Sequence, residues 1–386
     1  MLAQIEGKDH PISTAQRSIM HCINMLAPYQ KVAINGSLKF SQEDIFTAEE
    51  EFYWFMKELY TDMYDNPGEY LIPTAAYDEY KKMLKQKAGI EKMHYTDGKE
   101  CNLRNTFQQA IQFYSGFFYQ LGLYAKEIRE SDYALVIARS DLDEVKHSME
   151  WKHIYKENSR RYEVINSSGI EIRQESDKCY IRNKNYKKMF LGLYILCKAP
   201  DSKYKYMNYL RLDYNGLHRA MPGIEDIKMT LTKEHADIIN SIQNAVDSMK
   251  LKIRVKPLRN TTSGSRWKVE YLLKNKNVFG FYAEPDYLML CLYFNHVDHI
   301  NEMSRRLEES DQKLFQWFCS KFPERLCKCP SNRWAKFGTV RRRICGLSCR
   351  AEIENPDQLD VQNSILILKL FRNNEDANKQ HRNEVK

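Results

Sequence analysis

The stretch Trp-Lys-Val-Glu-Tyr-Leu-Leu at residues 267–273 decides how the second half of the chain is interpreted. Large apolar residues alternate there with Lys268 and Glu270, and this period of two predicts a half-buried β-strand. Two further strand patterns follow, Val-Phe-Gly-Phe-Tyr at residues 278–282 and an apolar run at residues 287–294. Three such runs joined by short turns predict an antiparallel sheet.

Helical patterns lie on both sides of these strands. Thr232 is a suitable N-cap for a helix that ends near residue 249 and carries isoleucines at helical spacing. Residues 300–322 and 360–371 repeat apolar side chains every three or four positions and predict two more helices. The second half therefore combines an antiparallel sheet with helices.

The first 130 residues predict a helical domain. The predicted helices share apolar residues at helical spacing and cover residues 15–26, 46–64, 73–88 and 103–128. The last of them is rich in Phe and Tyr. An aromatic stripe of this kind is typical of a packed core, and the alternative is a platform on which bases or a cofactor stack.

The pattern changes after residue 130. Ser140, followed by Asp143 and Glu144, resembles a capping box and predicts the start of a helix, and short strand-like runs follow. These runs cover residues 162–165, 170–173, 179–182, 189–196 and 206–214. A Lys-Asn turn followed by an aromatic run occurs twice, before residues 189–194 and before residues 278–282. Two interpretations stay open, an internal repeat and a chance similarity between hairpins.

These patterns together predict an α+β protein, with an all-helical N-terminal domain followed by two small units of antiparallel sheet and helix. The expected domains are residues 1–130, residues 131–225, and residues 226–372 with a basic, Cys-rich insertion at residues 322–350. Residues 373–386 lack large apolar side chains and predict a disordered tail.

The second half resembles a bacterial family in the order of its elements. The resemblance rests on Trp-Lys-Val-Glu-Tyr at residues 267–271, Val-Phe-Gly-Phe-Tyr-Ala-Glu-Pro-Asp at residues 278–286, and the strand at residues 287–294. This region is similar to a family of small α+β domains that shares its pattern with the GyrI-like ligand-binding domains. The resemblance covers residues 230–372 and, more faintly, residues 140–217.

The resemblance implies a curved antiparallel sheet with helices on one side and a pocket for a small organic molecule. The chain departs from the family at the insertion of residues 322–350, which leaves any function carried over from the family open. The whole layout also resembles conserved hypothetical proteins of anaerobic Gram-positive bacteria.

Aromatic strand residues near the mouth of a sheet would give a pocket apolar walls with polar tips. The candidate ligand-binding residues are Trp267, Tyr271, Phe281, Tyr282, Glu284 and Tyr287. We therefore expect first a non-enzymatic module that binds a small molecule or a protein. Glu284 is also a candidate general acid or base of an enzyme, but its Glu-Pro-Asp context is typical of a solvated turn, and no recognised catalytic spacing is present.

The net charge of +8 comes from one segment of the chain. Residues 321–350 contain nine basic residues and one acidic residue, Glu324, so the remaining residues are electrically balanced. Attraction to an anion should therefore be local. The composition, with 43% hydrophobic residues, also excludes collagen-like, coiled-coil and wholly disordered proteins.

The basic segment predicts nucleic-acid binding as the alternative function, because its cations could neutralise phosphates while Trp334 and Phe337 stack on bases. The candidate residues are Arg325, Lys328, Arg333, Arg341, Arg342, Arg343 and Arg350. A hairpin turn at residues 338–339 would place Arg341 and Arg343 on one face and Arg342 on the other. The competing interpretation is a solvated hairpin whose arginines pair with the acidic residues at 302–311.

Four cysteines of the same segment form two close pairs, Cys327 with Cys329 and Cys345 with Cys349. A hairpin could bring four thiolates together around Zn²⁺, and the neighbouring cations would offset the charge of the site. A single residue between the members of the first pair makes joint chelation harder than in ordinary zinc sites. Buried or incidental thiols are the competing interpretation.

The chain begins with several charged residues, so its N-terminus does not resemble a signal peptide. Its longest apolar run, residues 287–294, is much shorter than the roughly 18 residues that a membrane span needs. We therefore expect a cytoplasmic protein without a membrane partner, whose ten cysteines are not paired in disulfides.

Overall fold

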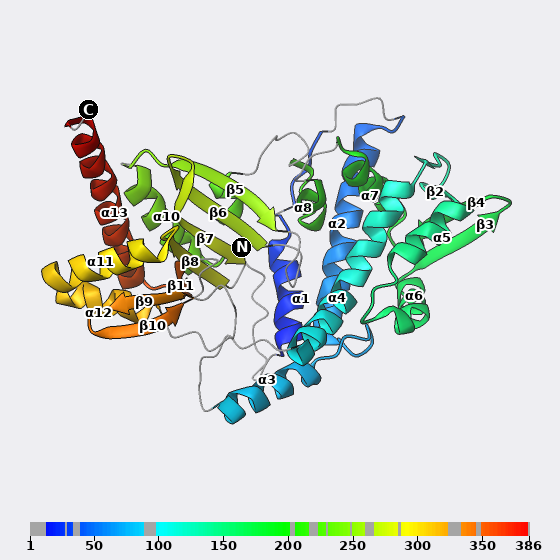
Figure 1. The fold of residues 1–386 in the computed structure, drawn as a ribbon. Helices are drawn as coiled ribbons and strands as arrows, with labels where there is room; N and C mark the ends of the chain where they lie inside the picture. Colours follow the sequence, from blue (N-terminus) through cyan, green and yellow to red (C-terminus); the bar gives the residue numbers. More distant parts are fainter. Residues whose placement is uncertain are drawn as a thin grey trace. The chain divides into compact units, whose positions relative to one another are not determined.

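The computed structural model describes most of the chain (Figure 1). The described residues are 13–27, 29–33, 39–88, 98–200, 205–215, 223–228, 231–247, 249–258, 266–284, 287–322, 333–344 and 349–384. They belong to two compact units, one of Met1–Pro222 with Leu258–Ser265 and one of Gly223–Pro257 with Arg266–Lys386. A helical N-terminal region followed by sheets confirms the predicted α+β class.

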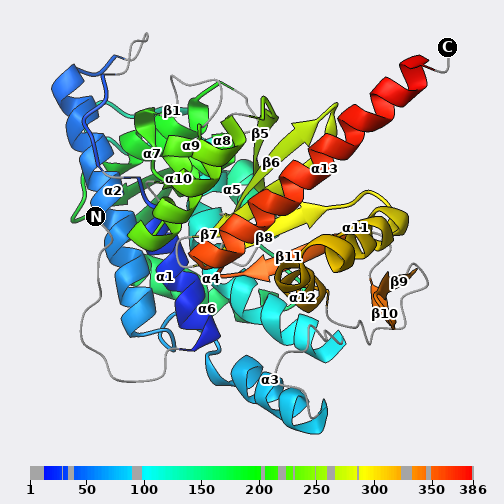
Figure 2. The same ribbon diagram turned by 90° about the vertical axis from the view of Figure 1, so that its left-hand side faces the viewer.

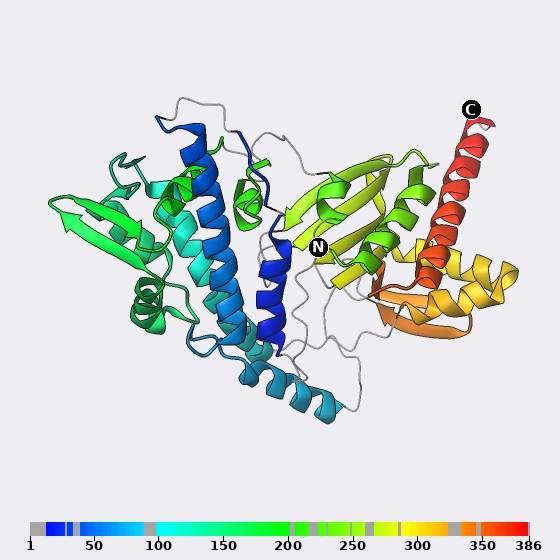
Figure 3. The same ribbon diagram turned by 180° about the vertical axis from the view of Figure 1, so that it is seen from behind.

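Long helices make up the start of the first unit (Figure 3). They are α1 (Thr14–Met25), α2 (Gln42–Asp65), α3 (Ala75–Ala88) and α4 (Gly98–Tyr124). Capping boxes fix the first two beginnings: the Ser13 hydroxyl accepts the Gln16 N–H at 3.1 Å, and the Ser41 hydroxyl accepts the Asp44 N–H at 3.1 Å. The four predicted helices are therefore confirmed, with ends that differ by several residues.

The core of the first unit is aromatic. Phe107, Tyr114 and Phe118 of α4 are buried, and the Phe118 ring meets the Phe55 ring of α2 edge to face, with centroids 5.2 Å apart. The aromatic stripe of α4 thus packs in the core, as expected. Helix α7 (Met189–Lys198) lies against both α2 and α4. Because this core also includes residues after 130, the boundary predicted there falls inside one unit.

Three segments predicted as strands are helical. Residues 162–165 lie in α6 (Asn158–Ser167), residues 189–196 in α7, and residues 206–210 in α8 (Lys205–Leu210). Helix α7 is buried nearly all round, so its residues are apolar without helical periodicity and resemble a buried strand. Since residues 189–194 are helical and residues 278–282 form a strand, the proposed internal repeat is wrong at this position.

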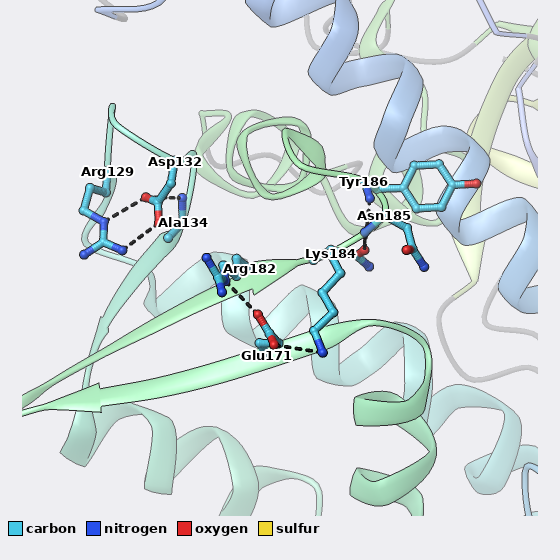
Figure 4. A network of polar contacts seen from close by, with 9 residues as sticks. Arg129, Asp132, Ala134, Glu171, Arg182, Lys184, Asn185 and Tyr186 are labelled. Atoms are coloured by element: carbon cyan, nitrogen blue, oxygen red, sulfur yellow. Dashed lines mark hydrogen bonds and ion pairs between the residues drawn. The ribbon is translucent and has the colours of Figure 1, made fainter.

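The first unit also contains a four-stranded antiparallel sheet in the order β1-β2-β4-β3. Its elements are β1 (Glu127–Ile128), β2 (Leu135–Ala138), α5 (Arg139–Ser148), the short helix η1 (Tyr155–Glu157), β3 (Ile170–Glu175) and β4 (Lys178–Asn183). Figure 4 shows polar contacts on this sheet: Glu171 of β3 pairs with Arg182 at 2.8 Å and with Lys184 at 3.0 Å. These pairs are exposed and connect neighbouring strands.

The second unit is built on a five-stranded antiparallel sheet in the order β11-β8-β7-β6-β5. Its strands are β5 (Lys252–Leu258), β6 (Arg266–Leu273), β7 (Lys276–Glu284), β8 (Tyr287–Tyr293) and β11 (Arg350–Glu354). The short helix α9 (Ile224–Lys228) and α10 (Lys233–Asp247) precede it, and α10 lies beside α13 (Gln358–Glu384) in Figures 1 and 3. The strands predicted at residues 267–273 and 278–282 are confirmed, and the strand predicted at residues 287–294 is confirmed with its end one residue earlier, at Tyr293.

A separate hairpin follows the sheet in this unit. Strands β9 (Arg333–Phe337) and β10 (Val340–Ile344) turn at Gly338, as predicted, and Gly338 has the positive φ of +59° that favours glycine. The hairpin lies against α11 (Val297–Ser310), which is visible in Figure 2. The helix predicted at residues 300–322 is split, because Asp311 ends α11 and its side chain accepts the Leu314 N–H of α12 (Gln312–Ser320) at 3.0 Å.

The C-terminal tail differs from the expectation of disorder. Helix α13 continues through residues 373–384, where no Pro or Gly interrupts it and most residues are compatible with a helix. No helix in the described part of the chain combines the length and apolar character needed to span a bilayer.

Candidate functional site

The six predicted ligand-binding residues do not share one surface. Trp267, Tyr271 and Phe281 are buried on the face of the sheet that α10 covers, where Gln243 donates a hydrogen bond to the Tyr271 hydroxyl at 2.8 Å. Tyr282 lies on the opposite face, directly across from Lys268. Tyr287 occupies a register position on the same face as Tyr282, two residues from Met289, which pairs with Tyr282. The side chain of Glu284 lies outside the described part of the chain.

The pleat of the strands explains why the six predicted residues do not share one surface. The ladder pairs Val269 with Phe281 and Lys268 with Tyr282, and successive residues point to opposite faces. Aromatic residues at positions 281 and 282 therefore cannot line the same wall. Trp267, Tyr271 and Phe281 belong to the core of the second unit, while Tyr282 belongs to the polar face of the sheet, which we define by Arg254, Lys256, Lys268, Glu270, Tyr282, Tyr293, Arg350 and Glu352.

A buried carboxylate organises one half of the polar face. Glu270 is only 1% exposed. Its Oε1 lies 2.7 Å from Lys268 Nζ and accepts a hydrogen bond from Asn277 Nδ2 at 2.8 Å, while its Oε2 lies 2.6 Å from the Arg254 guanidinium and 3.1 Å from Lys256 Nζ. One negative charge thus faces three positive charges.

These contacts fix the protonation state of Glu270. Burial alone would raise its pKa, but the hydrogen bonds from Lys268, Lys256, Asn277 and Arg254 lower that pKa to about 2. Glu270 is therefore ionised at neutral pH and is not a general acid.

The other half of the polar face is centred on Arg350. Its Nε donates to Glu352 Oε1 at 2.7 Å, and its Nη1 donates to the Tyr282 hydroxyl at 3.3 Å. The guanidinium also lies over the rings of Tyr282 and Tyr293, and Lys268 approaches both rings from β6. Burial raises the pKa of Tyr293, so its hydroxyl is neutral. The residues that define this face carry four positive charges and two negative charges, a net charge of +2.

The basic hairpin has two different faces. The ladder pairs Lys336 with Arg341 and Trp334 with Arg343, so these four residues point to the same side. We call this side the outer face of the hairpin. Trp334 is 49% exposed, and the Arg343 guanidinium lies 5.4 Å from the centroid of its ring. In the described part of the chain, Lys336, Arg341 and Arg343 form no ion pair.

The inner face holds the hairpin on the second unit. Ala335 and Phe337 are buried there, and the Phe337 ring packs on Phe322 with centroids 5.3 Å apart. Arg342 points inward, lies over the Phe337 ring, and donates to the Phe322 carbonyl at 3.1 Å. The predicted opposition of Arg342 to Arg341 and Arg343 is therefore confirmed.

The other predicted cations are dispersed. Arg350 belongs to the polar face of the five-stranded sheet, and Arg333 is exposed at the start of β9. Arg325 and Lys328 lie outside the described residues. Two acidic residues of α11 are paired within the helix, Glu302 with Arg306 and Glu309 with Arg305, while Glu308 of the same helix lies beside Gly338 at the hairpin turn.

Most of the proposed zinc ligands lie outside the residues that the structure describes. Cys327, Cys329 and Cys345 are not among the described residues, and Cys349 is buried next to β11. No group of three or more His, Cys, Asp or Glu side chains suited to a metal occurs in the ranges that are described. His296 caps the start of α11 and pairs with Asp298 at 2.8 Å.

No family model, curated protein or solved structure matches the chain. The outer face of the hairpin offers three cations for phosphates and one exposed ring for stacking. The polar face of the sheet, which sequence reasoning missed apart from Tyr282 and Arg350, offers cations and tyrosine hydroxyls. Its signal in the sequence was the pair of charged residues inside an otherwise aromatic strand, Lys268 and Glu270.

Proposed function

We propose that this protein binds single-stranded nucleic acid through the outer face of its β9–β10 hairpin. The observation that carries this proposal is the presence of exposed Trp334 among Lys336, Arg341 and Arg343, none of which is neutralised by a carboxylate within the described residues. Cations attract the phosphate backbone, and an exposed indole accepts any base by stacking.

The rest of the hairpin supports the same function. The Asn301 side chain accepts the Lys336 N–H at 2.7 Å, and Arg342 binds the Phe322 carbonyl, so the inner face is fixed to the helices. The binding side chains therefore stand on a rigid ribbon, which lowers the entropy lost on binding. A base that stacks on Trp334 would place its neighbouring phosphates beside the side chains of Arg341 and Arg343, which lie roughly 6–7 Å apart along β10.

The test is the salt dependence of binding. We would measure the fluorescence anisotropy of a labelled oligothymidine of about 10 nucleotides with the wild type and with Lys336→Glu/Arg341→Glu/Arg343→Glu. Three neutralised phosphates give a slope of log K against log salt concentration of about −2 for single strands, and the triple variant should lose this slope.

A matched control carries the same change of net charge elsewhere. Lys233, Lys276 and Lys313 are exposed and unpaired among the described residues, and Lys233→Glu/Lys276→Glu/Lys313→Glu should retain most of the affinity and the slope. Equal loss in the two triple variants would mean that only the overall charge matters and would reject the hairpin as the site.

The second candidate function is the binding of a small anionic ligand on the polar face of the sheet. It is favoured by the net charge of +2 over the residues that define the polar face, to which Lys268 and Arg350 contribute, since partly buried charges cost free energy and are frequent at binding sites. The resemblance to GyrI-like ligand-binding domains supports the same class of function. Both candidates are non-enzymatic and lie in the second unit.

Calorimetric titration with citrate and succinate tests this candidate. Lys268→Met should weaken citrate binding at least about tenfold, while Lys276→Met, at the exposed first residue of β7, should leave it unchanged. If both variants bind citrate as the wild type does, the polar face is a structural network only.

A further inference from the structure

A hollow of about 660 Å³ lies in the first unit, far along the chain from the hairpin. One side consists of the segment that precedes α3, with Leu71, Ile72 and Pro73, and the other of the segment before α6, with Ile154. Its volume is in the range of pockets that hold small organic molecules. The apolar residues of both sides provide a surface for a hydrocarbon body.

A buried cation lies at this hollow. Arg161 of α6 lines it and is only 2% exposed. Its Nη1 donates to the Ile154 carbonyl at 2.7 Å and its Nη2 to the Leu71 carbonyl at 3.1 Å, but its buried Nε makes no hydrogen bond. Arg161 forms no ion pair within the described part of the chain. A buried charge without a counter-charge is costly, so an anion from outside would stabilise it.

Two further cations stand at the rim of the same hollow. Lys152 and Lys156 are exposed, line it, and have no ion pair among the described residues. The carboxylate of Glu157, which also lines it, is engaged by Arg160 at 2.9 Å. The lining therefore carries three positive charges and one negative charge, that of Glu157. Its net charge of +2 raises the local concentration of anions.

We propose that this hollow binds a small organic anion, with a phosphate or carboxylate head group near the cations and an apolar body against Ile72, Pro73 and Ile154. The Arg161 guanidinium supplies the fixed charge at the wall, and the two lysines attract the head group from solvent.

Isothermal titration calorimetry tests this proposal with the full chain. Phenyl phosphate and benzoate represent the two head groups, and benzyl alcohol is the neutral control. We expect one of the two anions to bind and benzyl alcohol not to bind. Tighter binding of phenyl phosphate identifies a phosphate ligand, and tighter binding of benzoate identifies a carboxylate ligand.

The variants separate this site from general charge effects. Lys152→Glu/Lys156→Glu changes only exposed side chains and should weaken binding of the preferred anion at least about tenfold. Lys178→Glu/Lys187→Glu makes the same charge change at exposed positions outside the hollow and should have no effect. The triple hairpin variant should also bind normally. Unchanged affinity in the rim variant, or binding of neither anion up to about 10 mM, would overturn the proposal.

Discussion

Removal of the Trp334 indole should weaken nucleic-acid binding without changing its salt dependence. The ring is 49% exposed and stands on the outer face of the hairpin, so Trp334→Ala removes little packing and no charge. Stacking of a base on an aromatic side chain is worth about 1–3 kcal/mol, which corresponds to about a 5-fold to 150-fold loss of affinity. Trp334→Phe should recover part of this loss because it keeps an aromatic face.

The assay is fluorescence anisotropy of the labelled oligothymidine at several salt concentrations between about 50 and 200 mM. Trp54 provides a matched control, since it is 40% exposed on α2 in the first unit and also lies under a cation, with Lys57 Nζ 4.7 Å from its ring centroid. Trp54→Ala should bind as the wild type does.

Two results would refute the stacking argument. An unchanged affinity in Trp334→Ala would show that no base rests on the indole. A reduced salt slope in the same variant would mean that the substitution displaces the neighbouring arginines, so that the loss could not be assigned to stacking. Circular dichroism melting of each variant controls for unfolding.

Three further predictions concern the stability of the two units, measured by chemical denaturation. Because the pKa of Glu270 is lowered to about 2, its ionised form stabilises the fold above about pH 4.5, and this contribution is lost as the pH falls toward 2. Glu270→Gln should lower the free energy of unfolding by about 3 kcal/mol at pH 7. Equal stability of the variant and the wild type would contradict the stabilising role of the ion pairs around Glu270. Glu49 should give the opposite dependence of stability on pH. Burial raises its pKa to about 8, so the native state keeps the proton to a higher pH than the unfolded state does. The free energy of unfolding should therefore fall as the pH rises from about 4.5 to 8. Glu49→Gln should flatten that fall and raise the free energy of unfolding at pH 8 by roughly 2–4 kcal/mol, whereas an undiminished fall would exclude Glu49 as its source. Gly192→Ala should destabilise the first unit by about 1–3 kcal/mol, because the new Cβ would lie 2.3 Å from the Ala48 carbonyl oxygen. Gly98→Ala is the control and should not destabilise the unit, because no atom lies within 4 Å of the position of its Cβ. A similar loss of stability in both variants would reject the packing argument.

The sequence predicted most of the sheet in the second unit because β6 alternates and the two strands that follow it are short apolar runs between turns. Lys268 and Glu270 interrupt an aromatic strand at every second position, and that period belongs to β-structure alone. Helix α7 was not predictable in the same way. Its residues are apolar on all sides because it packs between α2 and α4, so they carry no periodicity that separates a helix from a buried strand.

The candidate sites show a similar division. The position of Arg341 and Arg343 on one face of the hairpin, with Arg342 on the other, follows from strand geometry and could be predicted. The assignment of Trp267, Tyr271 and Phe281 to a pocket could not be checked from sequence, because burial depends on where α10 lies. The contacts of Glu270 with Arg254 and Lys256 depend on the neighbouring strand β5 and on the register, which local sequence does not encode.

Photocross-linking tests the central claim most directly. An oligothymidine that carries 5-iododeoxyuridine would be irradiated with the full-length protein, and the cross-linked peptide would be identified by mass spectrometry. Binding through the outer face of the hairpin predicts an adduct on Trp334 that disappears in Lys336→Glu/Arg341→Glu/Arg343→Glu. Adducts found only outside residues 333–344, or an adduct on Trp334 that persists undiminished in that variant, would contradict the proposed site.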